Sequence, residues 1–362
     1  MIIGKRKIGH KFKPLIVCEL GINHGGSLSV AKKMVDLAHT NGADAIKNQT
    51  HIVDAEMIDV AKKVIPSNAN KSIYRVIKEN CMSFDNEIKL KKYVESKKMI
   101  YLSTPFSKEA ALKLNELGIK AFKIGSGECN NLPLIEIISK FKKPIILSTG
   151  LNDLKSIKES VKIIEKNKIN YALLHCISEY PANYKNLKLD YIYTLKKNFP
   201  KAIVGYSDNS IGITQCISAL AKGACIIEKH FTDSKQRRGP DIICSMDSKE
   251  LFFLKKSAEI VYLSNGSNKK ISKIEKKTAN FAFASVVSIK NINKGEKLSK
   301  KNIWVKRPGL GDFLAGDFKK LLGKKTKKFI MKNNFIKKNE IYNKKQYKKN
   351  LDGPVKQMTF EG

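Results

Sequence analysis

Residues 120–128 read Lys-Ala-Phe-Lys-Ile-Gly-Ser-Gly-Glu, and this stretch shows the pattern that decides the fold. It begins as a short β-type run and passes after Ile124 into small and polar residues. The segment before it, 107–118, has apolar residues at helical spacing, which predicts an amphipathic helix. Strands that alternate with helices in this way are typical of a parallel sheet.

The same pattern recurs along most of the chain. β-type runs occupy eight stretches, at 15–20, 43–48, 99–103, 120–125, 144–148, 171–176, 202–207 and 224–229. Helical patterns lie between them, at 28–41, 86–97, 107–118 and 153–167, and glycines stand where helices should end, at Gly42, Gly118 and Gly223. Eight such units in about 250 residues predict a (β/α)8 TIM barrel. A doubly wound open sheet is the alternative, but no Gly-x-Gly-x-x-Gly follows the first run.

Polar residues gather at or just past the ends of these runs. There are fifteen of them: Glu19, Lys47, Gln49, Ser103, Thr104, Lys123, Ser126, Glu128, Ser148, Thr149, His175, Tyr180, Ser207, Asp208 and His230. Any one of them can be a polar cap on a strand end. Together they predict an active site, because the carboxyl ends of the strands form the catalytic face of a TIM barrel.

The pattern changes after the eighth unit. We expect the barrel to occupy 1–263 and the polar, Lys-rich stretch 264–280, which has no apolar periodicity, to be a linker. A second small domain should span 281–342, beginning with the strand pattern Phe-Ala-Phe-Ala-Ser-Val-Val-Ser-Ile at 281–289. The last segment, 343–362, is basic and polar, and we expect it to be disordered.

The chain is strongly basic, with 69 Lys and Arg against 33 Asp and Glu and a formal net charge of +36. Such an excess can indicate a polyanion-binding protein. Here the excess is mostly Lys spread over the whole chain, with little aromatic interleaving, which favours a general compositional bias. We therefore expect no nucleic-acid partner.

The seven cysteines form no Cys-x-x-Cys pair, and several lie in apolar runs such as Leu-Leu-His-Cys at 173–176. This use of cysteine suits a reducing compartment. Neither a signal peptide nor a run of about 18 apolar residues is visible, so we expect a cytoplasmic protein with no membrane partner.

Three kinds of chemistry are suggested by the polar strand ends. Two lysines and several hydroxyls suit a small phosphorylated carboxylic acid: Lys47, Lys123, Thr104, Ser126, Ser148 and Ser207. His230, with Glu19 nearby if the barrel closes, suits Mn²⁺ or Mg²⁺, although a lone histidine is more often structural. Carboxylate, amide and phenol groups suit sugar hydroxyls: Glu128, Gln49, Tyr180 and Asp241, each of which can equally be a solvated or packed loop residue.

Specific motifs sharpen this interpretation over residues 14–340. They include Glu-Leu-Gly-Ile-Asn-His-Gly-Gly-Ser (19–27), Lys-Asn-Gln-Thr-His-Ile-Val (47–53), Leu-Ser-Thr-Pro-Phe (102–106), Phe-Lys-Ile-Gly-Ser-Gly-Glu-Cys-Asn-Asn (122–131), Glu-Tyr-Pro (179–181), Gly-Pro-Asp (239–241) and Trp-Val-Lys-Arg-Pro-Gly (304–309). With these motifs the chain resembles the bacterial N-acetylneuraminate (sialic acid) synthase family. The stretches 50–57 and 61–66 look most like its N-acetylneuraminate branch.

The resemblance implies a TIM barrel followed by an antifreeze-like (SAF) domain, acting as a domain-swapped homodimer. The implied reaction condenses phosphoenolpyruvate with N-acetylmannosamine and water to give N-acetylneuraminate and phosphate. The same condensation on a diacetamido-hexose, giving legionaminic or pseudaminic acid, is the alternative. A barrel that has lost catalysis and binds polyanions is a further alternative of another class.

The resemblance also implies roles for single residues. Glu19, Lys123 and Lys47 would be catalytic, with Glu19 beside the reacting centre, and Thr104, Ser126, Ser148 and Ser207 would contact phosphoenolpyruvate. Gln49, Glu128, Tyr180 and Asp241 would contact the sugar, and Arg307 would reach the partner's active site and contact the N-acetyl group. His230 would be one of two histidine ligands of the metal.

Two positions depart from the family pattern. The second histidine ligand falls on Asn209, and an asparagine that contacts phosphoenolpyruvate falls on Ser178. A carboxamide oxygen can bind a hard cation, but it is a weaker donor than imidazole for transition metals. The departure at Asn209 therefore puts the affinity for the metal in question without affecting the fold.

Overall fold

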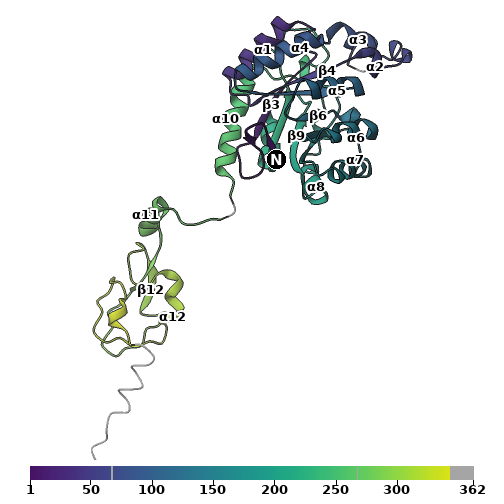
Figure 1. Ribbon diagram of the computed structural model, residues 1–362. Coiled ribbons are helices and arrows are strands. Elements are labelled where there is room, and N and C mark those ends of the chain that lie inside the picture. Colours follow the sequence, from purple (N-terminus) through teal and green to yellow (C-terminus); the bar gives the residue numbers. More distant parts are fainter. Residues whose placement is uncertain (67, 267, 343–362) are drawn as a thin grey trace, which may run out of the picture. The chain divides into compact units, whose positions relative to one another are not determined.

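The computed structural model describes residues 1–66, 68–266 and 268–342, and it contains two compact units (Figure 1). The boundary between them falls between Asn265 and Gly266. The first unit holds a parallel barrel with its helices, and the second is a small unit with a two-stranded sheet.

Eight parallel strands close into a barrel in the order β10-β3-β4-β5-β6-β7-β8-β9. Their bounds are β3 Leu15–Gly21, β4 Ala45–Thr50, β5 Ile100–Pro105, β6 Phe122–Ile124, β7 Ile145–Ser148, β8 Tyr171–Cys176, β9 Ile203–Asp208 and β10 Ile226–His230. Closure pairs β10 with β3, which places His230 opposite Glu19. The predicted TIM barrel is therefore confirmed, and the open sheet is excluded.

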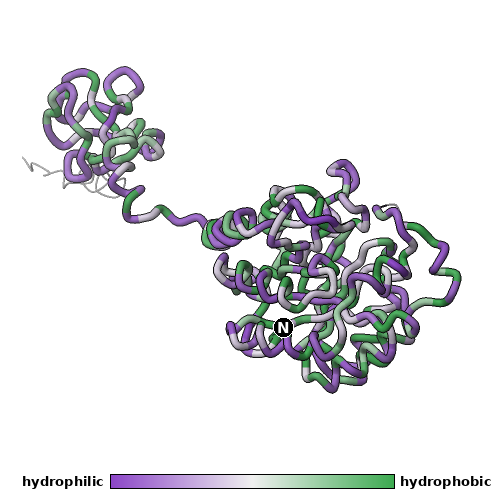
Figure 2. The backbone as a smooth tube through the Cα atoms, turned by 90° about the horizontal axis from the view of Figure 1, so that it is seen from above, coloured by the Kyte–Doolittle hydropathy of each residue, from purple (hydrophilic) through white to green (hydrophobic). Residues whose placement is uncertain are grey.

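Helices follow the strands around the outside of the barrel (Figure 1). They are α1 Leu28–Thr40, α4 Phe84–Ser96, α5 Lys108–Glu116, α6 Leu132–Lys140, α7 Leu154–Lys166, α8 Tyr191–Asn198, α9 Thr214–Ala221 and α10 Ser248–Ser264. Side chains cap the N-termini of α1, α4, α5 and α7, as expected for Ser and Asp. In Figure 2, hydrophobic and hydrophilic residues alternate along these helices, as one buried face requires.

The barrel interior is apolar at the amino ends of the strands. Inward-facing residues such as Leu15, Leu102 and Ile146 form one buried cluster there. The N-terminal hairpin, β1 Ile2–Ile3 and β2 Arg6–Lys7, adds Ile3 to this cluster, and Ile8 follows it. This packing fills one end of the barrel and leaves the carboxyl ends of the strands for polar side chains.

An excursion separates β4 from α4. It contains α2 Val53–Glu56, the 3-10 turn η1 Asp59–Lys62 and α3 Ile73–Asn80. A small cluster around Ile22, Val76 and Ile77 packs α3 beside the loop that follows β3. The excursion thus lies at the same end of the barrel as the polar residues.

The second unit differs from the prediction at its start. The predicted linker 264–280 contains most of a helix, α11 Lys273–Ala282, which begins at a capping box of Ser272 and Glu275. The strand predicted over 281–289 is shorter, β11 Ser285–Ser288, and pairs with β12 Ile303–Lys306. α11 buries none of its residues, and its apolar side chains Ile274 and Phe281, seven residues apart on one face, are exposed.

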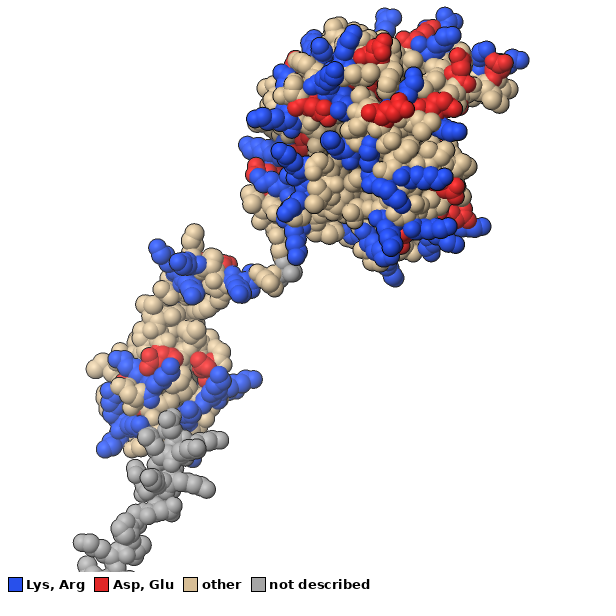
Figure 3. Space-filling model, viewed as in Figure 1, with Lys and Arg blue, Asp and Glu red and all other residues tan. Residues whose placement is uncertain are grey.

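A core of apolar side chains, including Val286, Ile303 and Leu321, lies between β11, β12 and the short helix α12 Phe318–Leu321. The predicted disordered tail, 343–362, lies outside the described residues. In the part of the chain that the structure describes, no helix is both long enough and apolar enough to cross a membrane. Lys and Arg side chains are scattered over the face seen in Figure 3, with acidic side chains between them.

Candidate active site

A cavity of about 290 Å³ opens where the barrel strands end. Twelve of the predicted site residues line it: Glu19, Lys47, Gln49, Thr104, Lys123, Ser126, Ser148, Ser178, Tyr180, Ser207, Asn209 and His230. They come from all eight barrel strands or the turns that follow them. Residues distant in the sequence therefore meet in one small space, because parallel strands bring their carboxyl ends to the same rim.

Two lysines and two carboxylates lie together at the base of this cavity. Lys47 forms an ion pair with Glu19, and its Nζ is 3.9 Å from Glu228 Oε1. Lys123 Nζ is 3.4 Å from the same oxygen of Glu228. All four side chains are buried, so each charge is matched by a neighbour of opposite sign and not by water.

Hydroxyl groups complete the surroundings of the lysines. Lys123 Nζ donates to Ser148 Oγ at 2.8 Å, and Lys47 Nζ donates to Thr104 Oγ1 at 3.2 Å. Ser207 Oγ donates to Glu228 at 3.1 Å. An incoming anion would find two ammonium groups and several hydroxyl donors already held in place.

Burial and neighbouring charges have opposite effects on the pKa values of Lys47 and Glu228. Burial lowers the pKa of Lys47 to about 7, the charge of Lys123 acts the same way, and Glu228 opposes both. Burial alone would raise the pKa of Glu228, but Lys123, Lys47 and the Ser207 hydroxyl outweigh it and lower that pKa. Glu228 is thus held as a carboxylate, whereas Lys47 can gain or lose its proton near neutral pH.

Glu228 is the main site residue that sequence reasoning missed. It lies two residues before His230 on β10, and both residues line the cavity. Because side chains alternate along a strand, Glu228 and His230 face the same side. That spacing of two was the signal that could have identified it.

A cradle of small groups lies beside the lysines. Gly150 N donates to Ser126 Oγ at 3.1 Å, and Ser178 Oγ is buried without a hydrogen-bond partner among the described residues. A Cβ atom at Gly150 would stand 2.5 Å from Ser178 Oγ and 2.7 Å from Ser126 Oγ. Glycine at position 150 therefore lets two serine hydroxyls approach the same point, where an oxyanion can accept from both.

The cavity also holds a nitrogen atom that is available to a ligand. His230 Nδ1 is buried without a hydrogen-bond partner in the described chain, whereas the Glu19 carboxylate is taken up by its ion pair with Lys47. Burial lowers the pKa of His230, so its imidazole is neutral at neutral pH. A neutral imidazole with a free nitrogen has the protonation state that a metal ligand requires.

Asn209 lies near this imidazole at the cavity wall. Its Nδ2 donates to the carbonyl of Ile177 at 2.9 Å, which fixes the orientation of the amide. Among residues 1–66, 68–266 and 268–342, no three His, Cys, Asp or Glu side chains are grouped closely enough to hold a metal. One imidazole and one carboxamide oxygen fit a cation such as Mn²⁺ or Mg²⁺ that keeps water ligands, and they do not fit a structural zinc site.

A buried ion pair supports the turn that carries Asn209. Lys229 Nζ donates to Asp208 Oδ2 and to the carbonyl of Ser210, both at 2.7 Å. Asp208 Oδ1 also accepts from Tyr206 and Ser210. The pair links β9 to β10 on the outer side of the barrel, so Asp208 is a structural residue here and not part of the cavity wall.

Four of the predicted rim residues lie outside the cavity wall, because their side chains point outward from the barrel. They face the helices or the neighbouring backbone: His175 bonds to the carbonyl of Leu187, Ser103 bonds to Glu87, and Thr149 bonds to the carbonyl of Leu174, as Asp208 bonds to Lys229. Each is adjacent in sequence to an inward-facing residue. The alternation of side chains along a strand sends these neighbours outward.

Three further candidates lie away from the cavity wall. Asp241 Oδ2 is 3.9 Å from His230 Nδ1, at the edge of the site. Glu128 is half-buried in the 3-10 turn Ser126–Glu128 and accepts from Asn131 Nδ2 at 2.5 Å. Arg307 is exposed in the second unit, directly after β12. Their roles toward a sugar stay predictions.

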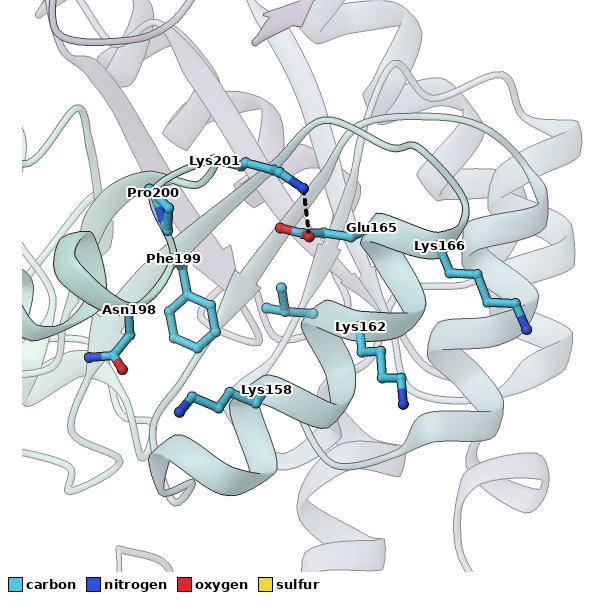
Figure 4. A pocket seen from close by; sticks show the side chains of 9 residues that line it. Lys158, Lys162, Glu165, Lys166, Asn198, Phe199, Pro200 and Lys201 are labelled. Carbon is cyan, nitrogen blue, oxygen red and sulfur yellow. Dashed lines mark hydrogen bonds and ion pairs between the residues drawn. The ribbon is translucent and has the colours of Figure 1, made fainter.

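A larger cavity, of about 660 Å³, lies outside the barrel between α7 and the residues after α8 (Figure 4). Lysines line it, and Lys201 pairs with Glu165 at 3.0 Å. No strand end contributes to it. It therefore offers none of the convergent groups of the barrel cavity.

Comparison with known proteins agrees with this architecture. The model of the NeuB family matches residues 34–270, and the model of the SAF domain matches residues 283–341. The N,N'-diacetyllegionaminic acid synthase of Campylobacter jejuni is 39% identical over 320 residues, covering 86% of this chain and 95% of that protein. The synthase of the same name from Legionella pneumophila is 34% identical over 322 residues, covering 86% and 90%.

A solved structure is also similar. The N-acetylneuraminic acid synthetase of Leptospira borgpetersenii, in complex with citrate, superposes with a TM-score of 0.71 at 32% identity, over 77% of this chain and 94% of that one. The family match spans more than half of the chain, from α1 to just past α10. The chain therefore belongs to the NeuB family, and its C-terminal unit is a SAF domain.

Proposed function

We propose that this protein is a synthase of the sialic acid type, which condenses phosphoenolpyruvate with an acetamido-hexose and water and releases phosphate. One observation carries the proposal. Lys47, Lys123 and a cradle of serine hydroxyls share a single cavity with Glu19 and with His230, whose Nδ1 has no hydrogen-bond partner among the described residues. The names of the relatives, which are synthases of legionaminic and sialic acids, support the same reaction class.

Phosphoenolpyruvate would bind against the lysine side of the cavity. Its phosphate and carboxylate groups are anions, and Lys47 and Lys123 supply the two cations. Ser126 and Ser178 supply hydroxyl groups around Gly150, and Ser148 supplies another beside Lys123. Glu228 holds both ammonium groups in place before the substrate arrives.

The sugar would bind in its open-chain form nearer to His230 and Tyr180. The bond that forms joins the enol carbon of phosphoenolpyruvate to the aldehyde carbon of the sugar. A divalent cation held by His230 and Asn209 would supply Lewis-acid polarisation of the aldehyde oxygen. Tyr180 and His230, whose ring centroids are 6.0 Å apart, would orient the sugar in the mouth of the cavity.

Glu19 would act on the carbon that carries the phosphate. Attack by the enol leaves positive character at that carbon, and a carboxylate beside it stabilises the charge or takes a proton from the water that adds there. The tetrahedral adduct then loses phosphate through cleavage of the bond between this carbon and the bridging oxygen. Lys47 and Lys123 would stabilise the charge of the departing phosphate.

Two sugars compete as the natural substrate. N-acetylmannosamine is the substrate that the sequence motifs at 50–57 and 61–66 favour. A diacetamido-hexose is the second candidate, because two relatives at 39% and 34% identity are named as N,N'-diacetyllegionaminic acid synthases. The first candidate would yield N-acetylneuraminate and the second N,N'-diacetyllegionaminate.

A substrate panel tests the proposal. Phosphate release from phosphoenolpyruvate is measured with N-acetylmannosamine and with diacetamido-hexoses, each with Mn²⁺ and after treatment with EDTA. We expect release only when a sugar is present, with one sugar preferred by its kcat/KM, and we expect EDTA to abolish it. Release that needs no sugar, or none with any sugar, would refute the proposed reaction.

A further inference from the structure

Glu56, His51 and Gln49 form a buried chain of side chains that ends at the cavity. His51 Nδ1 lies 3.0 Å from both carboxylate oxygens of Glu56, and His51 Nε2 lies 3.1 Å from Gln49 Oε1. The side chains of His51 and Glu56 are only 3% and 4% exposed. Gln49 lines the cavity, while His51 and Glu56 do not.

The ring of His51 is held on its face as well as at its edges. It stacks on Phe106, with ring centroids 4.4 Å apart and an angle of 11° between the planes. Phe106 also lines the cavity, at the end of β5, the strand paired with β4. Glu56 belongs to α2, so the start of the excursion after β4 supplies the carboxylate.

The contacts of His51 decide the orientation of the Gln49 amide. Both ring nitrogens face oxygen atoms, and a nitrogen must carry a hydrogen to bond to an oxygen acceptor. With both hydrogens present, His51 donates to Glu56 and to the amide oxygen of Gln49. The amide NH₂ of Gln49 is then left as a donor for the cavity. A His51 with a bare Nε2 would demand the opposite amide orientation.

We propose that Glu56 and His51 are positioning residues that orient Gln49 so that its NH₂ group donates a hydrogen bond to an acceptor oxygen of the sugar. That oxygen is a hydroxyl or the carbonyl of an acetamido group. The inference rests on the proposed function and adds to it a determinant of sugar recognition outside the cavity wall. A purely structural role, in which the pair only anchors α2 to β4, is the competing explanation.

A double-mutant cycle separates these explanations. His51→Phe keeps a ring on Phe106 but removes both donors, and Gln49→Ala removes the amide. We expect each single variant to raise the KM for the sugar about tenfold, the loss of one hydrogen bond, while the KM for phosphoenolpyruvate stays unchanged. In the Gln49→Ala background, His51→Phe should have no further effect, because His51 acts only through that amide.

Additive effects of the two substitutions would overturn the proposal, as would an equal rise in both KM values. The KM for phosphoenolpyruvate and the thermal unfolding temperature report whether each variant is folded. If His51→Phe does not fold, Glu56→Gln takes its place in the cycle, since it keeps the shape of the side chain and removes its charge.

A second measurement does not depend on activity. In protein labelled with ¹⁵N-histidine, the signals missing from His51→Phe identify His51, and we expect its Nε2 to carry hydrogen, because Nε2 faces the amide oxygen of Gln49. An Nε2 without hydrogen would refute the orientation of Gln49, whatever the kinetics. A wild type that shows this hydrogen but releases no phosphate with any sugar would refute the proposed reaction alone.

Discussion

Lys47 lines the same cavity as Lys123 and is surrounded by charged side chains. Lys47 touches Glu19 and lies near Glu228 and Lys123, and burial lowers its pKa to about 7. A lysine that can exist without charge in the empty site becomes charged when an anion binds next to it. The number of protons taken up when the substrate binds therefore reports the protonation state of Lys47 in the empty site.

We predict that phosphoenolpyruvate binding takes up a proton at pH 8 and much less at pH 6. Above about pH 7 the free protein holds part of Lys47 neutral, and the bound anion raises the pKa and recruits the proton. Calorimetry in buffers of different ionisation enthalpy measures the uptake. Lys47→Arg, which stays charged, should bind without uptake, and a wild type with no uptake at pH 8 would contradict the assignment.

Gly150 provides a second test at the scale of one atom. Gly150→Ala should raise the KM for phosphoenolpyruvate at least about tenfold, because the new methyl group would lie against the oxygens of Ser126 and Ser178. Gly127→Ala is the matched control: Gly127 lines the same cavity, but a Cβ there meets nothing within 4 Å. Steady-state kinetics should show little change for the control, and equal effects of the two changes would argue against the cradle.

Asn209 is one of the two positions, with Ser178, at which the resemblance implies a departure from the family pattern. Asn209→His should tighten Mn²⁺ binding by about tenfold or more, since imidazole is the better donor for a transition metal. Titration with Mn²⁺ followed by electron paramagnetic resonance measures the free ion. Unchanged or weaker affinity would show that position 209 does not contact the metal.

At the scale of the strand, side-chain alternation explains which sequence predictions held and which did not. The sequence showed all eight strands and the polar groups at their ends, because each strand is a short apolar run. It did not show which of two adjacent polar residues faces inward, so His175 and Asp208 were grouped with the site, and Glu228 was missed. Only closure of the barrel fixes that choice.

The helix α11 was hidden for a different reason. Its apolar residues are few, with Ile274 and Phe281 seven residues apart in a stretch rich in Lys, and the Ser272 and Glu275 capping box marks its start. The pairing of His51 with Glu56, five residues apart, depends on the turn between β4 and α2. The hydrophobic pattern does not report the geometry of that turn.

The buried pair between β9 and β10 yields a prediction for the element it supports. Lys229→Met should lower the free energy of unfolding by about 3–5 kcal/mol, because it leaves the buried carboxylate of Asp208 without its cation. Denaturant unfolding measures the loss. Lys158→Met, at an exposed lysine on α7, should change stability by less than about 0.5 kcal/mol, and similar losses for both would contradict the role of the pair.

For the molecule as a whole, the barrel and the SAF domain are separate compact units, and Arg307 is exposed on the second. We propose that the protein is a domain-swapped homodimer in which Arg307 of one subunit completes the cavity of the other. The resemblance to the family supports this proposal, and no arginine is among the described residues that line the barrel cavity.

Subunit mixing tests the proposal of action in trans. Arg307→Ala and Lys123→Met should each be nearly inactive, but coexpression should restore about a quarter of wild-type activity, because each mixed dimer would keep one intact site. If Arg307 acts within its own chain, no mixed dimer has an intact site. Coexpressed subunits that stay inactive would therefore contradict the exchange.

The most direct test of the central claim, that the strand-end cavity condenses phosphoenolpyruvate with a sugar, is sugar-dependent phosphate release by two lysine variants. Lys123→Met removes a buried cation of the cavity, and Lys162→Met removes an exposed lysine of the larger cavity on α7. We predict that Lys123→Met loses at least about 1,000-fold in kcat/KM, roughly 4 kcal/mol of transition-state stabilisation, while Lys162→Met keeps wild-type activity. Comparable activity of the two variants would contradict the account.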